Sequence, residues 1–99
     1  MIDIELVKKA ILLTQQGKIA EAREIYSNLE KENPDNPDLM SIIGLFYVNI
    51  YDFEKAIETL EKAVNLKKTL GTISALGFAY YEQRNYKKSA EILEDAIKF

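Results

Sequence analysis

A chain of 99 residues with no cysteine and no histidine cannot build a thiolate nucleophile, a disulfide or a Cys/His zinc site. Its formal net charge of -3 offers no basic footprint for phosphates, so we expect no nucleic-acid partner. The N-terminus is acidic where a signal peptide is basic, and no apolar run reaches the roughly 18 residues of a membrane span, so we expect a cytoplasmic protein without membrane association.

The chain is long enough for one core, and it repeats one unit three times. A shift of 34 residues superposes Leu13 on Tyr47, and a further shift of 33 superposes Gly44 on Gly77. A period in this range is typical of stacked solenoids, whose units are too small to bury their own apolar faces. We therefore interpret residues 1–99 as a single domain with repeats at about 3–36, 37–69 and 70–99.

Within each repeat, apolar residues recur every three and four positions, which is helical periodicity. The pattern predicts two helices per repeat and six in all. Short polar or glycine segments separate the two helices of a repeat, as a helical hairpin requires. These segments are residues 16–18, 51–52 and 84–85.

The two junctions between repeats differ in sequence. Pro34 and Pro37 are expected to end one helix and begin the next at the first junction. The second junction, residues 65–72, has no proline and is one residue shorter, so the sequence defines its geometry less well.

Small residues recur at equivalent positions of the repeats. A glycine costs a helix about 1 kcal/mol relative to alanine, so Gly44 and Gly77 imply a compensating close approach of two helices. Ala10 takes the same position in the first repeat, and Ala22, Ala56 and Ser89 are predicted to form the crossing point in the second helices.

These repeats resemble the tetratricopeptide repeat, whose signature runs Leu-Gly-x-x-Tyr, then Ala-x-x-x-Phe, then Pro. The second repeat reads Ile43-Gly44-x-x-Tyr47 followed by Ala56-x-x-x-Leu60, and the third reads Leu76-Gly77-x-x-Tyr80 followed by Ser89-x-x-x-Leu93. The first repeat matches less well but keeps the proline, at Pro34. The family tryptophan is replaced by Leu6, Met40 and Ile73. The resemblance implies an all-α fold, a right-handed alpha-solenoid of three helix-turn-helix repeats.

The resemblance also implies a function: a module that binds a protein or peptide in a concave groove lined by the first helices. In the family, groove residues recur at the second, fifth, ninth, twelfth and thirteenth positions of each repeat. The candidate peptide-binding residues are Val7, Ile11, Ser41, Leu45, Val48, Asn49, Phe78 and Tyr81. We expect Leu45 and Val48 to stay uncovered, Leu45 and Tyr81 to face a common hollow, and Phe78 and Tyr81 to anchor an amphipathic helix or an apolar extended segment.

Two alternatives to binding in the groove stay open. In one, these apolar residues pack only against each other across a tight curve. In the other, the chain is a structural unit that forms a homo-oligomer through an uncapped C-terminal helix, or an arm cut from a longer array. The candidate self-association residues are Ile92, Leu93, Ile97 and Phe99.

The sequence gives no basis for catalysis, a cofactor or a metal. Glu58, Glu61, Glu91 and Glu94 recur on second helices near lysines, which is typical of a solvated charged face. Asp35 and Asp38 lie in a segment that lacks the glycine and distal glutamate of a calcium loop. We therefore do not expect the chain to be an enzyme.

Overall fold

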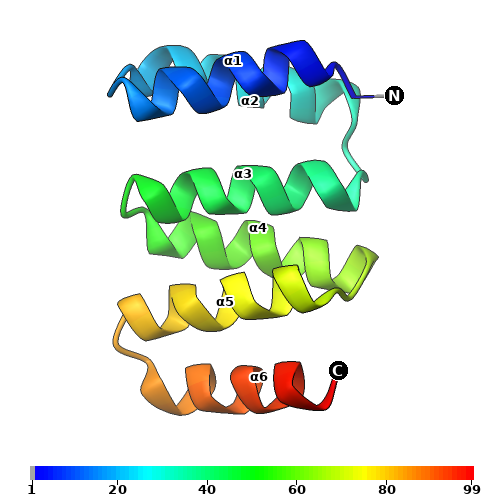
Figure 1. Cartoon of the computed structure of the whole chain (residues 1–99), viewed down its shortest axis with the longest axis vertical. Helices are drawn as coiled ribbons and strands as arrows, with labels where there is room; N and C mark the ends of the chain where they lie inside the picture. The colour runs from blue at the N-terminus through cyan, green and yellow to red at the C-terminus, as the bar shows by residue number, and fades with distance from the viewer. Residues whose placement is uncertain (1) are drawn as a thin grey trace.

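The computed structural model describes residues 2–99, and in them the chain forms six α-helices that stack as three antiparallel hairpins (Figure 1). The helices are α1 (Ile4–Gln15), α2 (Ile19–Glu32), α3 (Pro37–Asn49), α4 (Phe53–Leu66), α5 (Leu70–Glu82) and α6 (Tyr86–Lys98). The body measures 35 × 27 × 17 Å. The expected all-α solenoid is confirmed.

Polar side chains begin five of the six helices. Each N-cap oxygen accepts a hydrogen bond from a backbone N–H of the first turn, a group that otherwise has no partner in the helix. The caps are Asp3, Asn36, Asp52, Thr69 and Asn85. Pro37 occupies the first turn of α3, where its missing N–H costs nothing.

The turn inside each hairpin has one residue in the left-handed region. Gly17 has φ 78°, Tyr51 has φ 63° and Arg84 has φ 67°, and the three occupy equivalent repeat positions. Glycine adopts this conformation freely, whereas a residue with a Cβ is disfavoured there by about 1–2 kcal/mol. The predicted hairpin breaks are confirmed, and two of them carry a strained residue.

Glycine allows the helices of a hairpin to pack closely. A Cβ added to Gly44 would lie 2.5 Å from Leu60 of α4, and one added to Gly77 would lie 2.6 Å from Leu93 of α6. The buried Ser89 hydroxyl donates a 2.8 Å hydrogen bond to the Gly77 carbonyl, which satisfies a polar group at this crossing. The close approach predicted at both glycines is confirmed.

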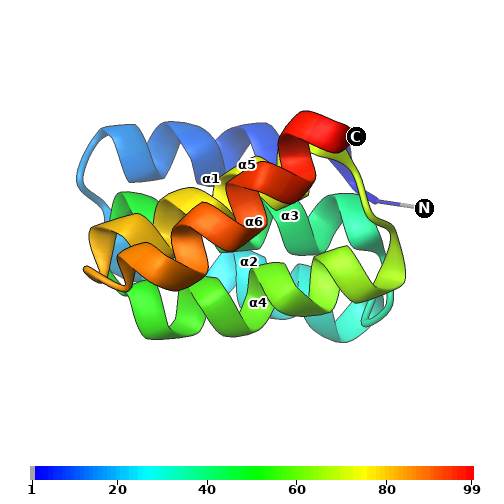
Figure 2. The same cartoon turned by 90° about the horizontal axis from the view of Figure 1, so that it is seen from below.

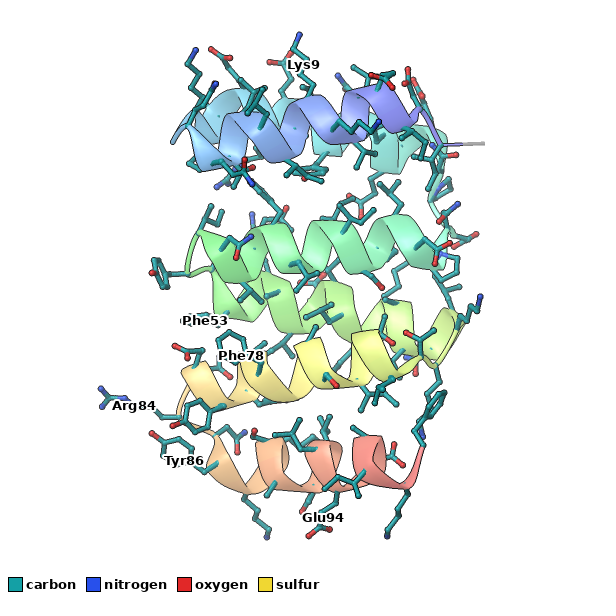
Figure 3. The ribbon with its side chains drawn as sticks, viewed as in Figure 1. Lys9, Phe53, Phe78, Arg84, Tyr86 and Glu94 are labelled. Atoms are coloured by element: carbon teal, nitrogen blue, oxygen red, sulfur yellow. The ribbon has the colours of Figure 1, made fainter. Side chains whose placement is uncertain are left out.

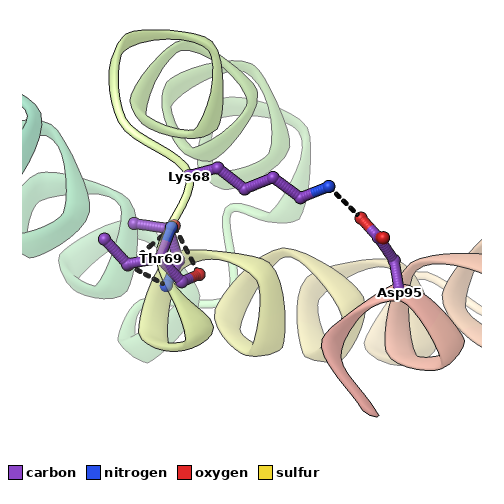
Figure 4. A network of polar contacts seen from close by, with 4 residues as sticks. Lys68, Thr69 and Asp95 are labelled. Atoms are coloured by element: carbon purple, nitrogen blue, oxygen red, sulfur yellow. Dashed lines mark hydrogen bonds and ion pairs between the residues drawn. The ribbon is translucent and has the colours of Figure 1, made fainter. Parts of the chain in front are cut away.

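The second junction is defined by a capping box in place of a proline (Figure 4). The Thr69 hydroxyl accepts from the Thr72 N–H at 3.1 Å, and the Thr72 hydroxyl accepts from the Thr69 N–H at 3.1 Å. Beside it, the Lys68 ammonium lies 2.6 Å from the Asp95 carboxylate of α6. At this junction α5 packs close against α4, whereas α2 and α3 lie farther apart.

The helices divide into two layers. Figure 2 shows α1 and α5 toward one side of the stack and α2 and α4 on the other, and Figure 1 shows α3 between α1 and α5 along the stack. Buried side chains of α1, α2 and α3, with Ala63 of α4, form one core cluster, and those of α4, α5 and the end of α3 form a second. The first helices therefore share one face of the molecule.

Candidate functional site

One apolar side chain from each first helix stands on this shared face. Ile11 of α1, Leu45 of α3 and Phe78 of α5 occupy the ninth position of their repeats. Their exposed fractions are nearly equal, at 43%, 45% and 47%. We call these three residues the apolar row. A row left half exposed in every repeat is not part of the core, so it is available to a partner.

A hollow of about 240 Å³ opens between α1 and α3. We call it the first hollow. Ile11 and Leu45 line its walls, and the core rings of Tyr26 and Phe46, whose centroids are 4.9 Å apart, lie at its base. Its remaining lining residues are Thr14, Gln15, Ile42 and Asn49. None of the lining residues carries a charge, so this hollow suits an apolar side chain.

A second hollow of about 280 Å³ opens between α3 and α5. Its lining residues are Val48, Asn49, Tyr51, Phe53, Phe78 and Glu82. Figure 3 shows Phe53 and Phe78 close to one another on the side of the stack where the hairpin turns lie. Asn49 lines both hollows, so the two form one continuous surface along α3.

The exposure expected for Val7 and Val48 is wrong. Val7 is 5% exposed and Val48 is 7% exposed, and each belongs to a core cluster. Val7 clusters with residues of α2 and α3, and Val48 clusters with residues of α5, so the next repeat helps to cover both. At the corresponding positions of the third repeat, Ser74 and Tyr81 are exposed because no further first helix follows α5 in the structure.

The other groove candidates lie at three different places. Asn49 is exposed and lines both hollows. Ser41 is half-buried, and its hydroxyl donates to the Pro37 carbonyl at 3.1 Å within its own helix. Tyr81 lies outside both hollows, with its ring 5.3 Å from that of Tyr86 on α6. The expectation that Leu45 and Tyr81 face a common hollow is therefore wrong, because the end of α5 turns Tyr81 toward α6.

The four self-association candidates divide into two pairs. Leu93 and Ile92 pack on α5 around Gly77, so they belong largely to the last hairpin and not to a surplus face. Ile97 is 84% exposed and Phe99 is 64% exposed. Of the four candidates, this second pair leaves the most open apolar surface, and Leu93 is 37% exposed.

The candidate list omitted several lining residues. Tyr26, Ile42 and Phe46 contribute to the first hollow, and Tyr51 and Phe53 to the second. One feature of the sequence could have indicated the second hollow: Tyr51 is a bulky residue at the turn position where the first repeat has Gly17.

No group of three or more metal-ligating side chains occurs in residues 2–99, and no helix among them has the length and apolarity needed to cross a membrane.

Solved tetratricopeptide structures superpose on most of the chain. The Sgt2 TPR domain from Aspergillus fumigatus aligns with a TM-score of 0.84 and 25% identity, over 95% of this chain and 63% of that one. The first TPR of Spaghetti (RPAP3), solved bound to the HSP90 peptide SRMEEVD, aligns with a TM-score of 0.84 and 22% identity, over 98% of this chain and 81% of that one.

Among curated proteins, the BBSome complex member BBS4 is 30% identical in Mus musculus and 28% identical in Bos taurus, over 83 residues in each case. The alignment spans 84% of this chain but only 16% of BBS4. The family model described as "Psidin, N-terminal TPR repeats region" matches residues 2–98. The chain therefore belongs to the tetratricopeptide repeat family.

Proposed function

We propose that the face formed by α1, α3 and α5 binds a peptide or an amphipathic helix of another protein. The observation that carries this proposal is the apolar row, which leaves one half-exposed apolar side chain per repeat beside two hollows. Fully burying a side chain of this size contributes about 1.5–3 kcal/mol, so covering the exposed half of three such residues provides a substantial part of a micromolar affinity.

The relatives support a binding role. The RPAP3 domain was solved with a peptide bound, and BBS4 is a member of a complex. The ligand preferred here differs in chemistry from a peptide held by basic groove residues, because the first hollow has no charged lining residue and the second has only Glu82. An apolar segment is the better match.

A selection from a random peptide library, followed by affinity measurement, tests the proposal. Peptides selected on the wild-type chain would be measured by fluorescence anisotropy against Leu45→Glu. Leu45 is 45% exposed, so the substitution places a charge in the middle of the apolar row with little effect on folding. We expect an affinity loss of at least about tenfold, equivalent to about 1.4 kcal/mol.

Leu12→Glu is the matched control. Leu12 is 52% exposed on α1 and lies outside the lining of both hollows, so the same substitution there should change affinity less than about twofold. Circular dichroism would check that both variants stay folded. Equal binding by wild type and Leu45→Glu would place the peptide elsewhere and contradict the proposal.

Self-association through α6 is the second candidate, favoured by the open surface of Ile97 and Phe99. Burial of two such side chains would be the driving force. Sedimentation velocity over a concentration series, on wild type and Ile97→Glu, distinguishes it from the first candidate. Oligomers that disappear in the variant support self-association, whereas a monomeric wild type at every concentration excludes it.

A further inference from the structure

The second hollow differs from the first in the chemistry of its walls. Three of its six lining residues are aromatic, namely Tyr51, Phe53 and Phe78. The rings of Tyr51 and Phe53 stand 6.0 Å apart at 80°, so they form two walls that meet nearly at a right angle. Its volume of about 280 Å³ is near the lower limit of small-ligand pockets, which suits one side chain better than a whole ligand.

Tyr51 is not explained by folding. It occupies the left-handed turn position, where glycine would avoid the cost of the Cβ. Its side chain is 78% exposed, so little apolar burial offsets that cost. Its ring stands beside Phe53 and lines the second hollow, so it is placed to contact a ligand there.

Glu82 gives this hollow its only charge. Its carboxylate is exposed and makes no ion pair within residues 2–99, where the salt bridges are Lys8–Glu5 and Lys68–Asp95. Arg84, the nearest cation in sequence, extends outward from the α5–α6 turn in Figure 3. The exposed Asn49 amide supplies a hydrogen-bond acceptor on the opposite side, from α3. A carboxylate and an amide oxygen beside aromatic faces form a site for a cation.

We propose that the second hollow binds the basic side chain of a lysine or arginine carried by the bound peptide, with the aromatic walls around its aliphatic stem and Glu82 at its charged end. This inference rests on the proposed function. It adds that the peptide is amphipathic along the groove, with an apolar residue in the first hollow and a basic one in the second. The net charge of -3 also favours approach of a cationic segment.

The test uses small probes, so that it does not depend on finding a natural peptide. The isotope-labelled full chain would be titrated with N-acetyl-lysine methylamide and, separately, with N-acetyl-norleucine methylamide, which lacks the ammonium group. We expect the lysine probe to shift the backbone amide signals of Tyr51, Phe53, Phe78 and Glu82, and the norleucine probe to bind at least about fivefold more weakly.

Glu82→Gln should weaken binding of the lysine probe at least about fivefold, while Glu91→Gln, the same charge change at an exposed residue of α6, should change it less than about twofold. Equal binding of the two probes would overturn the inference. So would an equal loss in the two variants, because binding would then follow net charge and not this hollow.

Failure of this inference and failure of the proposed function have different signatures. If selected peptides lose affinity on Leu45→Glu but the lysine probe does not bind at the hollow, only the inference fails. If the probe binds as expected but no selected peptide depends on Leu45, the groove function fails and the cation site stands. Replacing each basic residue of a selected peptide by norleucine, against wild type and Glu82→Gln, then identifies the residue that enters the hollow.

Discussion

The two junctions between repeats have the same topology but are filled by side chains of different size. At three equivalent buried positions, the first junction has Tyr26, Leu39 and Phe46, where the second has Leu60, Thr72 and Ala79. The second set is smaller at every position. This agrees with the closer approach of α4 and α5 than of α2 and α3.

The difference shows how one repeat geometry produces two kinds of hollow. Large side chains hold α2 and α3 apart, and the rings of Tyr26 and Phe46 reach the base of the first hollow. At the second junction, close packing leaves the second hollow between α3 and α5, with Tyr51 of the turn and Phe53 of α4 at its edge. Side-chain volume at the repeat interface therefore controls what the binding face presents.

The largest effect is expected at Phe46, which fills the first junction. Phe46 is 3% exposed and packs on Tyr26 and Tyr47. Phe46→Ala should lower the free energy of unfolding by about 3–5 kcal/mol through lost burial and the remaining cavity. Urea denaturation followed by circular dichroism measures the loss.

Leu12→Ala is the control for this prediction. Leu12 takes the position in the first repeat that Phe46 takes in the second, but it is 52% exposed because no repeat precedes it in the structure. Its loss should cost less than about 1 kcal/mol. Similar costs for the two substitutions would mean that Phe46 does not support the junction.

The reverse change tests the second junction. Ala79 is fully buried and corresponds to Phe46. Ala79→Leu should overpack the space between α4 and α5 and lower the free energy of unfolding by about 1–3 kcal/mol. An unchanged urea midpoint for Ala79→Leu would show that the second junction can widen freely. The proposed difference in packing between the first and second junctions would then be wrong.

The smallest effect concerns the hydrogen bond that the Tyr80 hydroxyl of α5 donates to Glu61 of α4. Tyr80→Phe should cost about 1 kcal/mol near pH 7. Burial, and secondly this hydrogen bond and the charge of Glu61, raise the pKa of Tyr80 to about 12, above the value of about 10 for an unfolded chain. The protonated hydroxyl therefore stabilises the fold fully below about pH 10, and this contribution is lost as the pH rises toward 12.

Denaturation of wild type and Tyr80→Phe at about pH 8 and about pH 11 checks the sign of this effect. The advantage of the wild type should shrink at the higher pH. Tyr86→Phe is the control at about pH 7, since Tyr86 is 56% exposed and should change stability by less than about 0.5 kcal/mol. A wild-type advantage that grows with pH would contradict the assignment.

Much of the fold could be predicted from the sequence because its signals are local. Periodicity indicated the helices, and two glycines at one repeat position indicated a close approach that the structure places against Leu60 and Leu93. The capping box of Thr69 and Thr72 was not predicted. Two threonines three residues apart are a weak signal without the proline that marks the first junction.

The candidate site was predicted only in part. The apolar row was expected to be exposed and is, although its role in binding stays a prediction. Val7 and Val48 were misplaced because their exposure depends on whether another repeat covers them, which a position within one repeat does not encode. The position of Tyr51 in the second hollow was not predicted, because the sequence indicates a turn there but not the direction of its side chain.

The near-equal exposure of Ile11, Leu45 and Phe78 has a consequence for the evolution of such arrays. Each of these residues lies outside both core clusters, so its exchange should disturb the interior less than exchange of a buried residue. The ligand preference of the groove can thus change one repeat at a time while the spacing of the repeats stays fixed. Protein engineering could follow the same route.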